Sequence, residues 1–552
     1  MRLTVEQRPQ TAAALVGARG DALIAAVFAL ATIATRFPFR SHRVFNWDAV
    51  NFVLAMRDYD VRLHHPHPPG YPVFVGLGRV VQLVVPGANA ALVTVAMLLS
   101  AGAVAALYWL GRELSGRAAG IVAALYLLVS VTFWTNGAVA LAYPSLACFG
   151  TLVALFAWRC NREGRSAGRM RSPRSRGNLT PPPPLHRDGE GAGVGSLLAL
   201  SAAYAIGGGF RPDLLLFLLP LWIFGHWRQP LTRILTSGAL VVAIVLAWFV
   251  PTVALSGGWT GYWHVFRAYT SDDVLKRYSV AENGPRALLV NIRDTAKYTG
   301  YALYALGLPV AGAAVWLLAH WRRWRNPLVL LFALWMTPML LFYTWLHIGD
   351  PGYVFTFVPA VLLIAARFTV EIPQLLRRFG ARTGGIQRAA PAIMAALVAF
   401  VMLANTAVFL FRPLALTAHG IRQQDRTIDG KIGFVRNHDH GDPATTLLIA
   451  YESYRHWLLY LPEYRVHFVD VTYGTDADRT VAIPPDVKRV VLMDATLLRS
   501  LTNAQPEAVT PIEADRVAVV TPTPNEPLRF APVPSPLLVR GAILESPFLT
   551  PR

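Results

Sequence analysis

Cysteine and charge are both scarce in this chain. Only two cysteines occur in 552 residues, and 15% of the residues are charged against 54% that are hydrophobic. Cys148 and Cys160 lie in or beside an apolar stretch, so they are interpreted as small apolar residues, and a disulfide framework is excluded. A Gly-rich phosphate loop and a paired catalytic motif are also missing from residues 412–552, which leaves that part of the chain without a recognisable enzyme signature of its own.

Long apolar runs take the place of charge. Residues 88–110, 234–255 and 389–411 are each long enough to cross a bilayer core of about 30 Å, and they do not alternate between polar and apolar residues as half-buried strands do. The first apolar run, 21–37, is not followed by a small-residue cleavage site, so we expect a retained span and not a removed signal. The sequence therefore predicts an α-helical polytopic membrane protein embedded in a lipid bilayer.

The net charge of +19 is unevenly distributed. Residues 1–411 hold 36 Lys/Arg and 16 Asp/Glu, whereas residues 412–552 hold 15 and 16. The whole basic excess lies in the apolar part, where retention of positive loops on the cytoplasmic side explains it. Nucleic acid is therefore not expected as a partner.

Charge parity predicts the orientation. With the N-terminal residues 1–20 inside, every second loop is rich in Arg and becomes cytoplasmic, and the Arg- and Ala-rich composition favours a bacterial inner membrane. Residues 71–86 must then not span, and we expect an interfacial helix there, because about 16 residues reach only about 24 Å. The eleven expected spans of the 21–411 domain are 21–37, 88–110, 118–135, 140–158, 196–209, 213–226, 234–256, 298–319, 328–346, 353–370 and 389–411.

Two segments differ from this pattern. Residues 161–195 are low in complexity, with four consecutive prolines and many arginines, so we expect a disordered cytoplasmic insert. Residues 412–552 predict a small soluble α/β domain on the outer face with a Pro-rich tail. Its expected strands are 446–450, 466–471, 487–493 and 516–520, with helices over 452–460 and 495–503.

The first outer loop, residues 38–87, carries the most specific motif. It contains Asn46-Trp47-Asp48-Ala49 and later His64-His65-Pro66-His67-Pro68-Pro69-Gly70-Tyr71-Pro72. An acid just outside the first span, followed by a Pro-Pro pair that leads into an interfacial helix, resembles the GT-C superfamily of membrane glycosyltransferases. Protein O-mannosyltransferases and lipid A aminoarabinose transferases are the relatives that it resembles.

The resemblance implies a polyprenyl-phosphate sugar donor and a cell-envelope acceptor, which would be a glycan, a lipid or a protein. It extends to Gly349-Asp350-Pro351-Gly352-Tyr353, and the chain departs from it in two places. Residues 138–143 are apolar where the family has a second acid, and His67 stands where some relatives carry Lys. The implied enzyme is an inverting hexosyl- or pentosyltransferase.

Sugar transfer in an inverting displacement needs a base that deprotonates the acceptor hydroxyl. Asp48 is the candidate, and the alternative is that it only caps a helix over residues 49–57. The donor phosphate needs cations, for which Arg211, between the two short spans, is the first candidate, with His67, Arg293 and Lys297 as others. The alternative for Arg211 is an ion pair with Asp213.

The remaining candidates would line a substrate pocket: Trp47, His65, His347, Asp350 and Tyr353. His65 and His67 could bind a divalent metal ion together with His347 or Asp350, or could serve as polar interfacial and phosphate contacts. The residue types of Gly-Asp-Pro-Gly also strongly favour a turn, so the alternative is that Asp350 only stabilises that turn. A flippase or transporter of lipid-linked sugars and a non-catalytic scaffold are the competing functions, and substitution of Asp48 discriminates between them and an enzyme.

Overall fold

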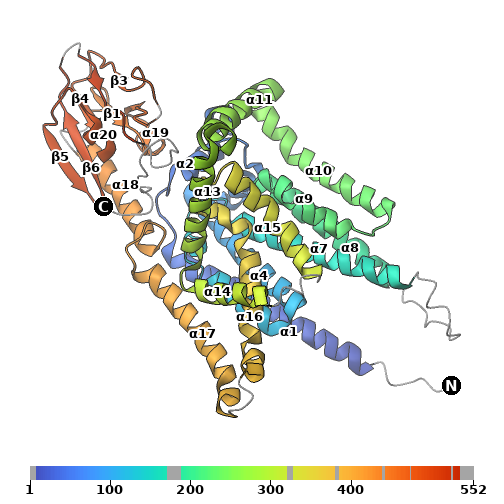
Figure 1. The fold of residues 1–552 in the computed structure, drawn as a ribbon. Helices are drawn as coiled ribbons and strands as arrows, with labels where there is room; N and C mark the ends of the chain where they lie inside the picture. Colours follow the sequence, from blue (N-terminus) through green and yellow to red (C-terminus); the bar gives the residue numbers. More distant parts are fainter. Residues whose placement is uncertain are drawn as a thin grey trace, which may run out of the picture.

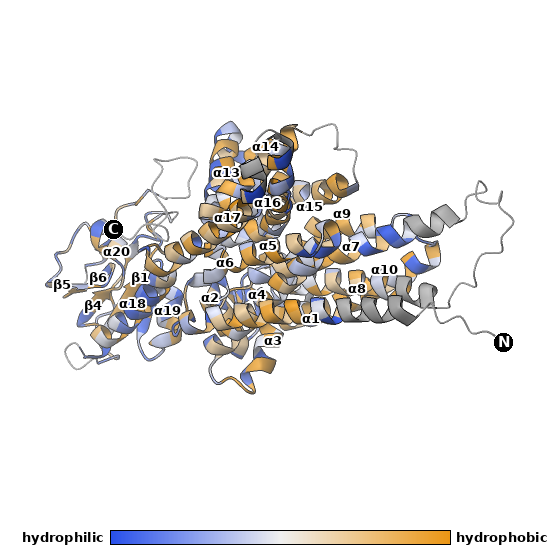
Figure 2. Ribbon diagram, turned by 90° about the horizontal axis from the view of Figure 1, so that it is seen from below, coloured by the Kyte–Doolittle hydropathy of each residue, from blue (hydrophilic) through white to orange (hydrophobic). Residues whose placement is uncertain are grey.

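The structure is a computed structural model, and it describes residues 8–170, 188–319, 327–379, 384–437, 442–472, 474–523 and 526–534. A bundle of helices occupies most of it, and a small α/β domain lies at one end of the bundle (Figure 1). Hydrophobic residues dominate the bundle, whereas the α/β domain is mainly hydrophilic (Figure 2).

The helices of the bundle and its outer connections follow one another along the chain. They are α1 (Arg8–Arg36), α2 (Trp47–Arg57), α3 (Pro72–Gln82), α4 (Ala88–Ser115), α5 (Arg117–Leu128), α6 (Val131–Asn136), α7 (Pro144–Met170), α8 (Asp188–Phe210), α9 (Asp213–His226), α10 (Leu231–Leu255), α11 (Gly258–Ala268), α12 (Lys276–Tyr278), α13 (Val280–Leu303), α14 (Gly307–Ala319), α15 (Pro327–Trp345), α16 (Val358–Phe379) and α17 (Gly384–Phe411). Short 3-10 helices cover Phe37–Phe39, Val61–Leu63, Tyr304–Leu306 and Pro351–Thr356, and a π-helix covers Tyr269–Leu275.

The predicted fold class, a helical membrane domain followed by a small α/β domain, is confirmed. Helix covers most of each of the eleven expected spans, but 118–135 is divided between α5 and α6, and α7 begins only at Pro144 within 140–158. In the described part of the chain, seven segments are long and apolar enough to cross a membrane alone. The helices Arg117–Leu128, Val194–Phe210 and Asp213–His226 are apolar but shorter. Helix α3 has 11 residues, or about 16 Å, which is too short to cross and agrees with an interfacial position.

Three expectations need correction. The segment 161–195 is not wholly irregular, because α7 continues to Met170 and α8 already begins at Asp188; residues 171–187 lie outside the described ranges. The expected outer loop 257–297 is largely helical, since α11, the π-helix, α12 and most of α13 lie within it. The expected span 298–319 is interrupted at Tyr304, where Asn405 Oδ1 accepts a hydrogen bond from the Ala305 amide at 2.9 Å.

The two ends of the bundle differ in their polar contacts. At one end, Asp21 is fully buried and pairs with Arg112 at 2.5 Å and Arg117 at 2.8 Å, while the Tyr108 hydroxyl donates to it at 2.6 Å. These contacts tie α1 to the α4–α5 turn. The opposite end carries the start of α2, the start of α7, the α8–α9 turn and the α15–α16 connection, and the α/β domain lies on this side (Figure 1).

The α/β domain has a five-stranded sheet in the order β2-β1-β4-β6-β5, with β1, β2 and β4 parallel and β6 antiparallel to β4 and β5. Helices α18 and α19 pack on one face through Ile428, Val435 and Trp457 against Leu448, and α20 packs on the other through Leu497. Its elements are α18 (Ala418–Asn437), β1 (Thr446–Ala450), α19 (Tyr454–Tyr460), β2 (Arg465–Phe468), β3 (Thr480–Val481), β4 (Arg489–Leu492), α20 (Ala495–Ser500), β5 (Ala508–Ile512), β6 (Asp515–Val520) and β7 (Leu528–Arg529).

Candidate functional site

Asp48 lies in the first turn of α2, at the end of the bundle that faces the α/β domain. The helix cap is Asn46, whose side chain accepts a hydrogen bond from the Ala49 amide at 3.0 Å. The alternative assignment of Asp48 as the cap is therefore wrong. Its carboxylate is 34% exposed and lies 3.7 Å from His67 Nδ1 and 3.5 Å from the Tyr143 hydroxyl. A solvent-accessible carboxylate beside two polar groups is available to accept a proton from a bound hydroxyl.

His67 is the partner that the Pro-rich loop supplies. The ring is buried against Phe52 and Tyr71, with the Nε2 atom 2.9 Å from the Tyr71 hydroxyl. Burial lowers the pKa of His67, and the nearby Asp48 charge only partly opposes this. The imidazole is therefore neutral at pH 7. When the Tyr71 hydroxyl donates to Nε2, the Nδ1 atom carries the proton and faces the Asp48 carboxylate at 3.7 Å, which is longer than a hydrogen bond.

Arg211 occupies the turn between α8 and α9, as the sequence predicts. Its side chain is 5% exposed and pairs with Asp213 at 3.0 Å. The guanidinium carbon also lies 4.4 Å from the Tyr353 ring centre, 5.3 Å from Tyr143 and 5.7 Å from Tyr71. We call these three rings the tyrosine cage. The guanidinium therefore packs beside three phenol rings and keeps only a small exposed surface.

Asp350 and its neighbours form the far wall of the site. The Asp350 side chain accepts a hydrogen bond from the Gly352 amide at 2.8 Å and caps the 3-10 helix Pro351–Thr356, so Asp350 has the structural role in a turn that the sequence suggested as an alternative. Burial raises the pKa of Asp350 to about 7, and the charge of Asp48 adds to the effect. His347 is also near: burial and then Arg211 lower its pKa to about 4, and its ring centre lies 4.3 Å from that of Tyr278.

Four predicted site residues have other surroundings. Arg293 pairs with Asp294 at 2.8 Å, and the Lys297 ammonium lies 5.9 Å from the Tyr301 ring centre, so along the described chain neither is seen to contact Asp48 or Arg211. The backbone of His65 pairs with Asp60, and its Nδ1 atom is buried. Trp47 faces the α/β domain, with ring centres 6.3 Å from Tyr454 and 6.1 Å from Phe468.

The metal hypothesis gains no support from the geometry. Among the residues that the structure describes, no group of three His, Cys, Asp or Glu side chains is arranged to hold a metal ion. In that part of the chain His65 and His67 are therefore not joined by a third ligand of these types.

Three residues of the site were missed in the sequence. Tyr143 and Tyr71 belong to the tyrosine cage, and Arg455 of α19 reaches the first loop from the α/β domain. Tyr143 could have been found from the sequence, because its polar hydroxyl stands directly before Pro144 in a segment that is otherwise apolar. Arg455 had no signal, because a single arginine in an amphipathic soluble helix is an ordinary surface residue.

Comparisons with known proteins concern the family and the fold. The family described as "Protein O-mannosyl-transferase TMEM260 N-terminal domain" matches residues 48–175, starting at Asp48. ArnT from Cupriavidus metallidurans bound to undecaprenyl phosphate has a similar fold, with a TM-score of 0.52 and 13% identity over 91% of this chain and 97% of that chain. The resemblance to the GT-C glycosyltransferases is therefore confirmed, and the fold is theirs.

Other matches are weaker. The apo form of the same ArnT aligns with a TM-score of 0.49 and 15% identity over 91% of this chain and 98% of that chain. The Archaeoglobus fulgidus oligosaccharyltransferase in the apo form aligns with a TM-score of 0.47 and 12% identity over 85% of this chain and 69% of that chain. A search of curated sequences finds no match.

Proposed function

We propose that this protein is a membrane glycosyltransferase that moves a hexosyl or pentosyl group from a polyprenyl-phosphate donor to a hydroxyl of a cell-envelope acceptor. The single observation that supports it best is the grouping of Asp48, His67 and Arg211 at one end of a GT-C-like bundle. The ArnT relative carries undecaprenyl phosphate, which favours the same class of donor here. The reaction takes place at the outer face of a bacterial inner membrane, with the N-terminus cytoplasmic.

The proposed step is an inverting displacement. Asp48 accepts the proton of the acceptor hydroxyl, whose oxygen attacks the anomeric carbon of the donor sugar. The bond from that carbon to the phosphate oxygen breaks, and the electron pair leaves with the polyprenyl phosphate. His67 keeps the Asp48 carboxylate oriented, and Arg211 stabilises the negative charge that develops on the phosphate.

Tyr353 and Asp350 line the side of the site opposite Asp48 in this proposal. Asp350 is positioned to hold a sugar hydroxyl, and its raised pKa makes it available as a donor as well as an acceptor near neutral pH. His347 and Trp47 complete the pocket at its margins. Arg293 and Lys297 remain proposed only as distant contributors to the positive potential, since Arg293 is already paired with Asp294.

The test uses full-length protein in lipid nanodiscs and undecaprenyl-phosphate-linked mannose, glucose and arabinose in turn. Release of undecaprenyl phosphate measures turnover whether the acceptor is an envelope extract or water. We expect Asp48→Asn to lose about 10²–10⁴ in rate, the usual contribution of a general base, with an unchanged melting temperature.

Asp58→Asn is the matched control. This acid ends the same helix and lies outside the site. Full activity of Asp48→Asn would refute the proposed base and would favour a flippase or a scaffold, both of which tolerate Asn. Equal losses in both variants would show that the effect concerns α2 and not the carboxylate.

A further inference from the structure

The α/β domain contacts the backbone of the first outer loop directly before Asp48. The Asp425 carboxylate accepts hydrogen bonds from the amides of His42 at 3.0 Å and Arg43 at 2.8 Å. The Val44 amide donates to the Tyr460 hydroxyl at 2.8 Å, and His456 Nε2 lies 3.1 Å from the Val44 carbonyl oxygen. These contacts hold the domain on the loop independently of the residues considered next.

Arg455 reaches further into the loop than any of these contacts. Its guanidinium carbon lies 5.6 Å from the Trp47 ring centre, and its Nη1 atom donates to the Leu63 carbonyl at 3.1 Å. Trp47 directly precedes Asp48, and Leu63 leads into the segment that carries His67. One side chain therefore contacts both arms of the loop whose two polar groups, Asp48 and His67, lie 3.7 Å apart.

Arg455 is partly buried, and its side chain does not satisfy all of its hydrogen-bond donors among the described residues. Within this same part of the chain, its Nε atom is buried without a hydrogen-bond partner, and burial lowers the pKa of Arg455. After burial itself, Arg455 is the largest cause that lowers the pKa of His64 and of His65, so its charge acts inside the loop. A partly desolvated arginine is unfavourable for stability, which favours a role in the site.

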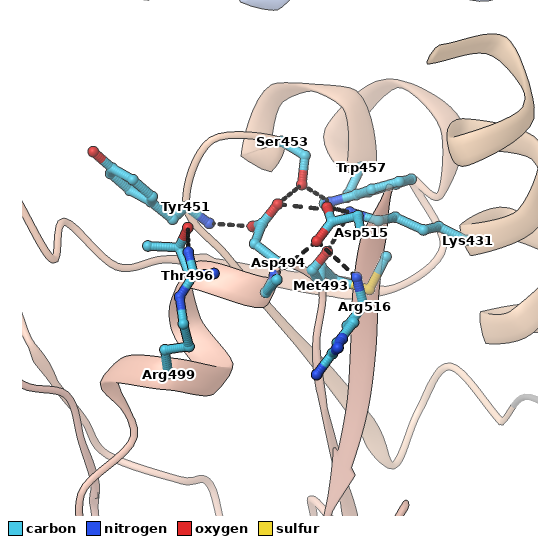
Figure 3. A network of polar contacts seen from close by, with 11 residues as sticks. Lys431, Tyr451, Ser453, Trp457, Met493, Asp494, Thr496, Arg499, Asp515 and Arg516 are labelled. Atoms are coloured by element: carbon cyan, nitrogen blue, oxygen red, sulfur yellow. Dashed lines mark hydrogen bonds and ion pairs between the residues drawn. The ribbon is translucent and has the colours of Figure 1, made fainter. Parts of the chain in front are cut away.

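A polar network holds Tyr451, Ser453 and Trp457, which lie on either side of Arg455 in the sequence (Figure 3). The Asp494 carboxylate accepts hydrogen bonds from the Tyr451 amide at 2.7 Å and the Ser453 hydroxyl at 2.5 Å, and Trp457 Nε1 donates to the Ser453 oxygen at 2.8 Å. Lys431, which is 2% exposed, donates to the Met493 carbonyl at 2.5 Å and pairs with Asp515 at 2.5 Å. Ser453 and Trp457 flank Arg455 in sequence, so the arginine projects from an anchored turn.

We infer that Arg455 is a positioning residue through which the α/β domain sets the geometry of Asp48 and His67. This rests on the proposed function. Under this inference the α/β domain supports the active site through Arg455, which contacts Trp47 and Leu63. Displacement of a base by about 1 Å costs about 10²-fold in rate, so loss of the Trp47 and Leu63 contacts is expected to affect turnover and not donor binding.

The experiment compares Arg455→Ala and Arg455→Lys in full-length protein, with the same nanodisc turnover assay. We expect Arg455→Ala to lower kcat at least 10-fold with a donor KM within about 2-fold of the parent. Lysine keeps the charge over Trp47 and one donor, so Arg455→Lys should recover part of kcat. The control is Arg465→Ala, which removes an exposed arginine of the same domain that pairs with Asp486, and it should leave kcat unchanged.

A further variant, Asp425→Ala, reports the effect of loosening the domain as a whole. An unchanged kcat in Arg455→Ala, or a loss expressed only in donor KM, would overturn the positioning role. So would a loss of kcat that comes with the same fall in melting temperature as Asp425→Ala. If Asp48→Asn is fully active, the proposed function itself is refuted. If Asp48→Asn is inactive while Arg455→Ala is fully active, only the positioning role of Arg455 is refuted.

Discussion

Substitution of Arg211 separates a phosphate-binding role from a purely structural one. In the structure the guanidinium is 5% exposed, pairs with Asp213 at 3.0 Å and lies 4.4 Å from the Tyr353 ring centre. Breaking a buried ion pair costs about 3–5 kcal/mol, but Asp213 keeps 24% exposure and can hydrate, so we expect the lower end of that range or less. Loss of a charge-assisted contact to phosphate costs about 1.5–3 kcal/mol, which is about 10- to 150-fold in affinity.

The assay measures both quantities on the same samples. Undecaprenyl phosphate is titrated into Arg211→Ala, Arg211→Lys and Asp213→Ala in nanodiscs, and melting curves are recorded without ligand. We expect Arg211→Ala to bind about 10- to 150-fold more weakly. Arg211→Lys should fall between this variant and the parent, because a lysine supplies charge without the planar fork of donors.

Asp213→Ala supplies the contrast. It removes the same ion pair but leaves the guanidinium in place within the tyrosine cage. We expect it to lower the melting temperature while it keeps or improves the affinity for undecaprenyl phosphate. If Arg211→Ala and Asp213→Ala were equally destabilised and both kept the parental affinity, Arg211 would have no phosphate role.

Two further predictions concern pH and orientation. Because burial raises the pKa of Asp350 to about 7, the folded state keeps a proton between pH 4 and 7 that the unfolded state releases, so the free energy of unfolding falls as pH rises through that interval. The melting temperature of Asp350→Asn should therefore fall less steeply with pH than that of the parent. Parallel curves for the two proteins would contradict the raised pKa. The orientation is tested in a variant in which the buried Cys148 and Cys160 are replaced by alanine. An impermeant maleimide added outside cells should label Asp476→Cys and not Arg228→Cys. The opposite pattern would reverse the proposed topology.

Local patterns predicted much of the fold. Continuous apolar runs marked the helices because a span satisfies its backbone hydrogen bonds internally, and β1 begins and ends at the expected residues, Thr446 and Ala450. The sequence could not give the length of α8, because its first turn lies in a low-complexity segment without an apolar pattern. It also could not give β5, since a strand with Pro511 depends on pairing with β6 and not on its own propensity.

The candidate site was predicted only in part, for a related reason. Asp48, His67, Arg211 and Asp350 each stand next to a helix end with a strong local signal, and the structure brings them together. The cage tyrosines and Arg455 carry no such signal, since their role depends on which helix ends meet. Arg293 and Lys297 show the converse: suitable charge near an outer helix end does not fix the direction in which a side chain points.

The site draws on the chain from residue 48 to residue 455, and this has a consequence for biosynthesis. Asp48 leaves the ribosome first, but Arg211, Asp350 and the α/β domain that contacts its loop follow in that order. A nascent or truncated chain that ends after α17 would already contain the base and the guanidinium, yet it would lack Arg455 and the Asp425 contacts. If Arg455 positions the base as proposed, an unfinished chain in the membrane hydrolyses the lipid-linked sugar at least about 10-fold more slowly than the finished protein.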